Sequence, residues 1–333
     1  MSQSTRNFFA ERPVVVADGG MGTNLFRAGL PPGAAPEFWN LERPQRVQAV
    51  HRAFVEAGAD VILTNSFGGN RRRLGLYEAQ ARVGELNQAA AELAREVADE
   101  AAREVLVAGS LGPTGELFEP LGALRRADGV AIFAEQADAL AAGGCDLLWI
   151  ETVAAAEELE AALTAAAGTG LPVVATMSFD CAGRTMMGVA PAEALALCEQ
   201  LPAPPLAFGA NCGAGPAEMV ETVTELARAA GPRDLIVAKS NCGIPEYRDG
   251  RMDYGSPPEV MAAYACLARD AGARVIGGCC GATPAHTAAM ARALAERPRG
   301  PAPDRAAIEA ELGPLGPARS GARRERASRR RRR

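Results

Sequence analysis

Two adjacent cysteines, Cys279 and Cys280, are the residues whose type and spacing first indicate chemistry in this chain. They follow a short β-branched run and two glycines, a pattern that predicts a buried strand ending in a sharp turn. A disulfide between neighbouring cysteines is strained, but both thiolates can bind one soft metal ion, for which zinc is the usual choice. We therefore interpret the pair as part of a metal site, with two reduced core cysteines as the alternative.

A third ligand must come from elsewhere in the chain, and two cysteines are candidates. Cys212 and Cys242 each stand in an Asn-Cys-Gly tripeptide after an apolar run, and the spacing alone does not choose between them. Three protein thiolates leave the fourth tetrahedral position open, which is typical of a catalytic site. Such an electron-rich site activates water poorly, but it can hold a substrate thiol as the thiolate, because metal coordination deprotonates thiols. The residues thus indicate thiol alkylation.

The elements that must position these cysteines alternate regularly along the chain. Apolar runs predict eight strands, at residues 14–17, 60–63, 105–108, 146–150, 173–176, 206–209, 235–238 and 275–276. Segments rich in Ala, Glu, Leu and Arg predict helices between them, at residues 45–57, 71–103, 131–142, 155–167, 217–230, 258–271 and 284–295. Alternating strands and helices indicate a parallel sheet, and eight units favour an α/β fold of the closed (β/α)8 type, the TIM barrel. A doubly wound open sheet is the alternative, but its Gly-x-Gly-x-x-Gly turn is absent after the first strand.

Polar and glycine-rich residues follow most of the predicted strands. Asp18 follows the first strand, Thr64 the second and Glu151 the fourth. In barrel enzymes the active site lies at the carboxyl ends of the strands. We therefore expect these residues to share one rim of the barrel with the cysteines.

A single barrel domain is expected over residues 1–298, because prolines at 298, 301 and 303 interrupt the pattern. Residues 299–333 are expected to form a disordered C-terminal extension, with room for one short helix at 306–312. The net charge is −5, although residues 319–333 contain nine arginines and one glutamate, so the rest of the chain is more acidic than that value. An acidic body argues against nucleic acid as a partner.

No membrane partner is expected, because no apolar run approaches the roughly 18 residues that cross a bilayer. The first dozen residues lack the apolar core of a secretory signal, and eight cysteines without such a signal suggest a reducing compartment. We therefore expect a cytoplasmic protein that acts on small molecules. The sequence leaves its oligomeric state open, and a homo-oligomer is compatible with it.

Six motifs, in this order, resemble the homocysteine S-methyltransferase family. They are Asp18-Gly-Gly-Met-Gly-Thr, Thr64-Asn-Ser-Phe, Gly109-Ser-Leu-Gly-Pro-Thr-Gly, Ile150-Glu-Thr, Gly209-Ala-Asn-Cys-Gly and Gly277-Gly-Cys-Cys-Gly. The resemblance covers roughly residues 12–297. Within the family the chain is most similar to stand-alone bacterial betaine–homocysteine S-methyltransferases, and next to the homocysteine-binding module of cobalamin-dependent methionine synthase.

The resemblance implies a (β/α)8 barrel that binds Zn2+ through Cys212, Cys279 and Cys280, with Cys242 only a neighbour of the site. It also implies that Asp18 and Glu151 bind the ammonium group of homocysteine. Backbone N–H groups near Gly19 and Gly20 and the Thr64 hydroxyl would then bind the carboxylate. Alternatively, Asp18 caps the N-terminus of a helix, and Glu151 forms an ion pair with a structural role.

The implied reaction is methyl transfer from glycine betaine to homocysteine, which gives methionine and dimethylglycine. Trp39 and Phe67 are candidates for contact with the quaternary ammonium of the donor, with core packing as the alternative. Lys239 and Asn241 are candidates for contact with a substrate carboxylate. His51 and His286 are expected on helix surfaces and are not assigned as bases.

Other donors stay open: S-methylmethionine, a dimethylsulfonium compound, or a separate methylcorrinoid or folate partner protein. A non-enzymatic zinc-thiolate binding or sensing protein is a further alternative. The substrate motifs around Asp18, Thr64 and Glu151 argue against it.

Overall fold

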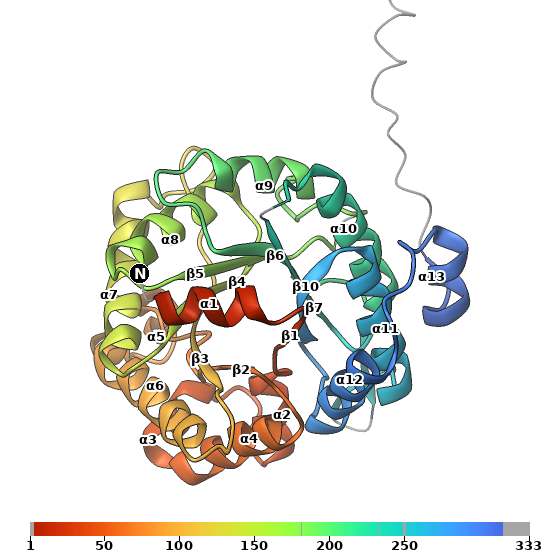
Figure 1. Ribbon diagram of the computed structural model, residues 1–333. Helices are drawn as coiled ribbons and strands as arrows, with labels where there is room; N and C mark the ends of the chain where they lie inside the picture. Colours follow the sequence, from red (N-terminus) through yellow and green to blue (C-terminus); the bar gives the residue numbers. More distant parts are fainter. Residues whose placement is uncertain (1–2, 181, 233, 249–250, 316–333) are drawn as a thin grey trace, which may run out of the picture.

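Eight parallel strands form a nearly closed barrel that helices surround (Figure 1). The computed structural model describes residues 3–180, 182–232, 234–248 and 251–315. The strands are β1 (Val15–Val16), β2 (Val61–Leu63), β3 (Leu106–Leu111), β4 (Leu147–Val153), β5 (Val173–Met177), β6 (Ala207–Cys212), β7 (Leu235–Ser240) and β10 (Ala273–Gly278). Their order is β1-β10-β7-β6-β5-β4-β3-β2, so the expected (β/α)8 fold is confirmed and the open doubly wound sheet is not.

The ring is joined between β1 and β2 by few contacts. A single parallel bridge links Ala17 to Val61, and the Asp60 N–H donates to the Val16 carbonyl at 2.7 Å. Side chains add to this join, since Asp60 Oδ2 accepts from the Val16 N–H at 2.9 Å and Asp18 Oδ2 accepts from the Leu63 N–H at 2.8 Å. A second backbone hydrogen bond runs from the Asp18 N–H to the Val61 carbonyl at 3.1 Å, so two backbone and two carboxylate contacts hold these short strands together.

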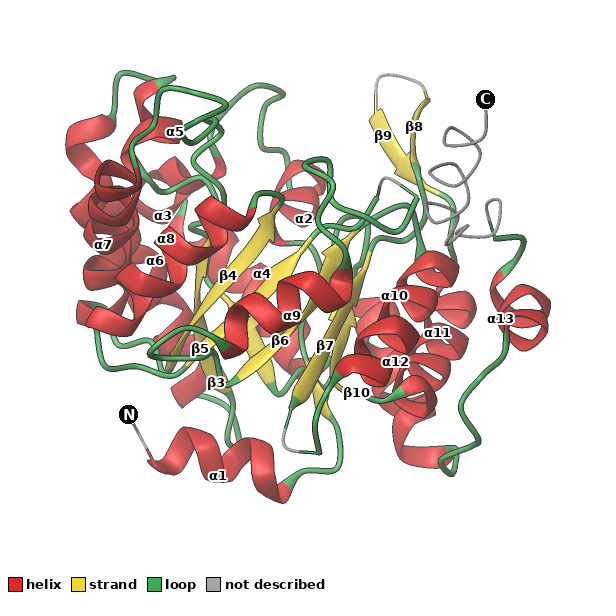
Figure 2. Cartoon of the chain, turned by 90° about the horizontal axis from the view of Figure 1, so that it is seen from above, coloured by secondary structure: helices red, strands yellow, loops and turns green. Residues whose placement is uncertain are grey.

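Apolar side chains fill the barrel, and its amino end is covered by α1 (Gln3–Glu11) (Figure 2). Along β4, Leu147 and Trp149 belong to the cluster inside the barrel, whereas Leu148 and Ile150 pack with the surrounding helices. Phe8 and Phe9 of α1 join the inner cluster. The chemistry of the site is therefore confined to the carboxyl end of the strands.

The surrounding helices agree with most of the predicted segments. They are α2 (Met21–Arg27), α3 (Trp39–Glu42), α4 (Pro44–Glu56), α5 (Arg71–Gly75), α6 (Val83–Asp99), α7 (Arg126–Ala142), α8 (Ala156–Gly168), α9 (Pro191–Glu199), α10 (Pro216–Ala229), α11 (Pro258–Ala271) and α12 (Pro284–Glu296), with 3-10 turns η1 (Pro36–Phe38) and η2 (Gln80–Arg82). The prediction of one continuous helix over 71–103 is wrong. Asn70 caps a short α5 that ends at Gly75, and Glu78 has a left-handed φ of 57°, so the chain turns before α6 begins.

A β-hairpin that the sequence analysis did not include follows β7. Its strands are β8 (Pro245–Arg248) and β9 (Arg251–Tyr254), and it projects above the carboxyl end of the barrel (Figure 2). The base of the hairpin is fixed to the barrel, because the Ser256 N–H donates to the Cys242 carbonyl at 2.9 Å. The hairpin thus carries Tyr254 toward the rim.

The C-terminal helix α13 (Arg305–Leu312) packs against α10 and α11. Ile308 and Leu315 are buried in that contact, and Asp304 caps the helix by accepting from the Ala307 N–H. The arginine-rich segment within residues 316–333, for which disorder is expected, lies outside the described residues. None of the helices in the described part of the chain has the length and apolar character that crossing a bilayer requires.

The expectation for His51 is wrong. It lies on the inner face of α4 and is fully buried, and burial lowers its pKa to about 3. Neither ring nitrogen has a hydrogen-bond partner among the described residues. The sequence does not show that the side chain of a single histidine within a helix points toward the core.

Candidate metal centre and substrate cavity

Three cysteines converge at the carboxyl end of the barrel. Cys212 ends β6, and Cys279 and Cys280 directly follow β10, with β7 between these two strands. The Cys212 sulfur lies 3.4 Å from that of Cys279 and 3.9 Å from that of Cys280, and all three lie within 4.8 Å of one another. The expected three-cysteine metal site is confirmed.

The spacing and charge of the sulfurs fit zinc. A zinc ion about 2.3 Å from each sulfur places the sulfurs about 3.8 Å apart in tetrahedral geometry, close to the separations found here. Hydrogen bonding from Cys212 lowers the pKa of Cys280, which favours a thiolate in the cluster. Soft, anionic sulfur ligands are those that zinc prefers.

The backbone aims the sulfurs at one point. Cys212 has a left-handed φ of 58°, which turns its side chain toward the pair after β10. The Cys279 N–H donates to the Ser240 carbonyl at 2.7 Å, and the Cys280 N–H donates to Asn241 Oδ1 at 3.0 Å. The side chain of Asn241 therefore holds the turn that carries the vicinal pair.

Cys242 does not belong to the cluster of described residues that could hold a metal. It is fully buried, and its N–H donates to the Cys280 carbonyl at 3.0 Å. Of the two cysteines that the sequence left open, Cys212 is thus the one that lies beside the pair. Cys242 supports the turn through its backbone.

The three cysteines line a cavity of about 310 Å³ that opens at the carboxyl rim. Glu151 and Lys239 also line it and are buried, which places them at its inner end. Phe67 lines its more exposed part. The cavity therefore joins the metal site to a polar floor and an aromatic mouth.

A buried ion pair forms part of the floor. Lys239 Nζ lies 2.8 Å from Asp18 Oδ1, and the other Asp18 oxygen accepts from Leu63. Burial alone would lower the pKa of Lys239, but the carboxylates of Asp18 and Glu151 outweigh it and raise that pKa. Asp18 lies beneath Lys239 rather than on the cavity wall, so Lys239 is the member of the pair that faces the substrate space.

Glu151 and Thr64 line the cavity and are held by neighbours. Glu151 Oε1 accepts from the Ser110 hydroxyl at 2.6 Å, and burial raises the pKa of Glu151 to about 7 despite the opposing charge of Lys239. Thr64 Oγ1 accepts from the Ser110 N–H at 2.9 Å and shares a 2.6 Å hydrogen bond with the Ser66 hydroxyl. Ser110 therefore orients both predicted substrate contacts.

Gly19 and Gly20 also line the cavity, where they let the loop after β1 approach the cysteine turn. A Cβ on Gly20 would lie 2.6 Å from the Cys279 carbonyl oxygen, and one on Gly19 would lie 2.6 Å from that of Ala282. The Gly20 N–H donates to Ala282 at 3.3 Å, so this backbone group already has a partner. The two glycines thus permit close packing around the metal site.

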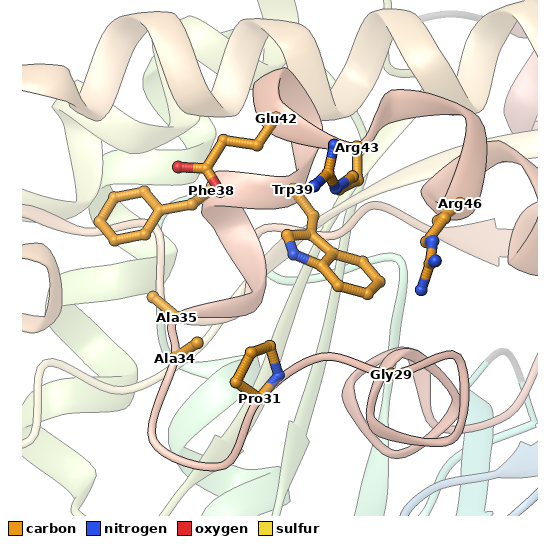
Figure 3. A pocket seen from close by; sticks show the side chains of 9 residues that line it. All are labelled: Gly29, Pro31, Ala34, Ala35, Phe38, Trp39, Glu42, Arg43 and Arg46. Carbon is orange, nitrogen blue, oxygen red and sulfur yellow. The ribbon is translucent and has the colours of Figure 1, made fainter.

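The four predicted donor contacts separate in space. Phe67 and Lys239 line the substrate cavity, whereas Asn241 lies outside its lining. Trp39 lines a different pocket of about 330 Å³, where the Arg46 guanidinium lies 5.3 Å from the centre of its ring (Figure 3). The structure therefore places Trp39 away from the cysteines.

Several cavity residues were missed by sequence reasoning. Phe26, Tyr77, Glu37 and Arg73 all line the cavity, and the two aromatic rings are more than 40% exposed. Tyr77 was hidden inside the predicted helix 71–103. The glycine that ends α5 two residues earlier is the signal that could have placed it in a turn at the rim.

Asn211 is a further residue that the sequence analysis did not single out. Its amide donates to Thr152 Oγ1 at 2.7 Å, and its Oδ1 accepts from the Thr152 N–H at 2.8 Å. Thr152 has a left-handed φ of 64°, which is uncommon for a β-branched residue. This clamp fixes Glu151 relative to Cys212, since each is the chain neighbour of one clamped residue.

Comparisons with known proteins agree with this geometry. A model of the family described as "Homocysteine S-methyltransferase" matches residues 15–294. The methionine synthase of Mycobacterium tuberculosis is 35% identical over 298 residues, which are 85% of this chain and 25% of that protein. That of Mycobacterium leprae is 33% identical over 85% of this chain and 24% of its own length. The chain therefore spans about a quarter of the length of these relatives.

Solved structures of the homocysteine methyltransferase MmuM from Escherichia coli have the same fold. The metallated form has a TM-score of 0.73 and is 24% identical in sequence. The match covers 98% of that chain and 86% of this one. The oxidized form has a TM-score of 0.71 and 25% identity, with 99% of that chain and 87% of this one covered.

Proposed function

The chain belongs to the homocysteine S-methyltransferase family, and from that premise we propose that it methylates homocysteine with glycine betaine as the donor. The products are methionine and dimethylglycine. The observation that carries the proposal is the convergence of three cysteine sulfurs in a cavity that Glu151 and Lys239 also line. This arrangement offers a soft ligand site for a thiol beside charged groups for an amino acid.

Homocysteine would lie at the inner end of the cavity. Glu151 is placed to accept from its ammonium group, and Lys239 is placed to donate to its carboxylate, since both side chains line the cavity. A zinc ion held by Cys212, Cys279 and Cys280 would supply deprotonation of the substrate thiol at neutral pH. Asp18, predicted as a direct ammonium contact, would act through Lys239, to which it is paired.

Betaine would lie nearer the mouth. Phe26, Phe67 and Tyr77 offer aromatic faces to its quaternary ammonium, and the Glu37 carboxylate lies in the same lining. Arg73 could pair with the betaine carboxylate. These groups suit a small zwitterion whose positive end points toward the cysteines.

The transfer needs no protein base. The homocysteine sulfur forms a bond to the methyl carbon while the carbon–nitrogen bond of betaine breaks, and nitrogen keeps the electron pair. Negative sulfur and positive nitrogen neutralise each other as this proceeds, so a site that excludes water favours the reaction. The chain holds the two reactants in line and keeps solvent out.

The test is a methionine assay with zinc-loaded protein, homocysteine and each donor in turn. Betaine is expected to give methionine and dimethylglycine in equal amounts. S-methylmethionine and a dimethylsulfonium compound form parallel arms. Methionine from either of them but not from betaine would overturn the choice of donor, and no turnover with any small onium compound would exclude direct transfer.

A donor carried by a second protein is the other candidate, because the chain corresponds to about a quarter of two methionine synthases. In that case the exposed aromatic mouth would face a methylcorrinoid or folate protein instead of a free onium compound. Adding a methylcorrinoid to the same assay separates the two candidates. Turnover only in that arm would favour the carried donor.

A further inference from the structure

Glu37 places a carboxylate in the wall of the substrate cavity, in the part where the methyl donor is proposed to lie. It belongs to the 3-10 turn η1, and the residue is only 4% exposed. Phe67 and Tyr77 line the same cavity. A buried carboxylate is costly unless other groups compensate its charge. The neighbours of Glu37 therefore show whether the protein provides that compensation by itself.

The protein compensates the charge of Glu37 only in part. Glu37 Oε1 accepts from the Gly68 N–H at 2.7 Å, and in the described part of the chain no cationic side chain lies within ion-pair distance of the carboxylate. Arg73 acts on it only from farther away. Burial raises the pKa of Glu37, as expected for a carboxylate whose charge is incompletely compensated. A bound cation would supply the missing positive charge.

The carboxylate is fixed by its own turn and by the loop after β2. The Pro36 carbonyl accepts from the Asn65 amide at 2.8 Å, and the same amide donates to Asn40 Oδ1 at 2.9 Å. A Cβ on Gly68 would lie 3.0 Å from Glu37 Oε1 and 3.5 Å from Oε2. The glycine thus leaves room for both carboxylate oxygens beside the loop.

Glu37 and Arg73 are two side chains of opposite charge that line the cavity and differ in exposure. Glu37 is buried, whereas Arg73 is exposed. A zwitterion that contacts both side chains would therefore have its cationic group in the buried part and its carboxylate nearer the solvent. This is the orientation that a donor needs if its methyl group is to reach a bound thiol.

We propose that Glu37 selects the methyl donor by charge: its carboxylate binds the cationic nitrogen or sulfur centre of an onium compound and so discriminates against neutral molecules of the same shape. The inference deepens the proposed function and rests on it for the identity of the reaction. It assigns the specificity for a cation to one residue. The aromatic rings of the cavity discriminate less strongly, because aromatic side chains also pack against apolar groups.

The strength of this selection follows from the interaction of opposite charges. An opposite charge about 4–6 Å away shifts an ionic equilibrium by about one to three powers of ten. A cation bound beside Glu37 is therefore expected to bind at least about tenfold more tightly than a neutral molecule of the same size. Glu37→Gln removes the charge but keeps an oxygen that can accept from the Gly68 N–H, so the loop keeps its hydrogen bond.

The experiment compares pairs of ligands that differ in charge and share one shape. Betaine is paired with tert-butylacetate, in which carbon replaces the quaternary nitrogen. Dimethylsulfonioacetate is paired with isovalerate, in which a CH group replaces the sulfonium. Isothermal titration calorimetry of zinc-loaded protein without homocysteine gives the four affinities. The wild type is expected to prefer the cationic member of a pair by at least about tenfold.

Two variants test whether Glu37 causes that preference. Glu37→Gln should reduce it by about tenfold or more and leave the small part that cation–π contact supplies. Glu42→Gln is the matched control, because Glu42 lies in the neighbouring pocket and outside the lining of the substrate cavity (Figure 3). It should keep the wild-type preference. Zinc content and circular dichroism are measured for both variants.

In the methyl-transfer assay Glu37→Gln should change the KM for the donor rather than kcat. The positive charge of the donor disappears as its methyl group leaves, so Glu37 stabilises the bound donor at least as much as the transition state. The KM for the donor should rise about tenfold, while kcat should not fall and the KM for homocysteine should stay unchanged. A fall in kcat at unchanged KM would contradict the proposal.

Equal affinity of the wild type for both members of each pair would overturn the proposal, even if the variant failed to fold. A preference that Glu37→Gln retains, or that Glu42→Gln loses equally, would overturn it as well. These outcomes are separate from the methionine assay. If betaine gives methionine but Glu37→Gln keeps the preference, the proposed function stands and the inference fails. If Glu37 selects only within the sulfonium pair, the inference stands and betaine is not the donor.

Discussion

Replacing Lys239 with methionine should lower the free energy of unfolding by about 3–5 kcal/mol. Lys239 and Asp18 form a 2.8 Å ion pair in which the two side chains are 2% and 0% exposed. Methionine is similar in size to lysine, so little of the loss comes from packing. The loss comes from leaving the Asp18 carboxylate buried with only the Leu63 N–H as a partner.

Replacing Asp18 with asparagine should lower the free energy of unfolding by less than Lys239→Met does. This difference between the two variants makes the prediction specific. Lys239 interacts with the Glu151 carboxylate as well as with Asp18, so Asp18→Asn leaves the ammonium one negative neighbour. Combining Asp18→Asn with Lys239→Met removes both charges and should recover stability to within about 2 kcal/mol of the wild type.

Urea denaturation of the zinc-loaded proteins, followed by circular dichroism, measures these values. Fluorescence is less suitable, because Lys239 lies 5.2 Å from the Trp149 ring and its removal would change the signal directly. A loss below about 1 kcal/mol in Lys239→Met, or additive losses in the double variant, would refute the argument that the pair is mutually dependent.

The remaining predictions concern the metal, pH and the donor. Cys212→Ala should lose zinc and Cys242→Ala should retain it, as measured by metal content after dialysis; full retention in the first variant would contradict the assignment of ligands. Glu151 has a folded pKa of about 7 against an ordinary 4.5, so the folded state binds the extra proton between these values. Glu151 therefore contributes stability to the metal-free protein that is lost as pH rises from 4.5 to 7, whereas the lowered pKa of buried His51 acts in the opposite direction. The difference in the free energy of unfolding between the wild type and Glu151→Gln should therefore shift in favour of the variant over this range, as measured by urea titrations at several pH values. Phe67→Ala should raise the KM for betaine about two- to fivefold and leave the KM for homocysteine unchanged, in steady-state assays that vary one substrate at a time.

The barrel could be predicted from the sequence because its strands and helices differ in length and composition. The predicted strand at 173–176 differs by one residue from β5, and the predicted helix 258–271 has the bounds of α11. The metal site could be predicted because strands in a parallel barrel bring their carboxyl ends to one rim, whatever their separation along the chain. Cys212 and Cys279 therefore meet although 67 positions separate them.

The predictions that failed depend on local turns and on the direction of single side chains. The helix expected over 71–103 breaks because Glu78 adopts a left-handed conformation, which composition does not reveal. The sequence likewise does not show that the Trp39 ring packs in a separate pocket beside Arg46. Asn211 was missed because its contacts depend on a clamp between two strands, which the sequence does not show.

The sparse join between β1 and β2 has a consequence for how the protein responds to its substrate. Asp18 closes that join through Leu63 and also holds the lysine on the cavity floor, so the same carboxylate serves both. An amino acid bound at Lys239 would tie these groups together more firmly. Occupancy of the cavity would then slow the opening of the barrel wall itself, and protection from amide exchange at Leu63 would rise with substrate concentration.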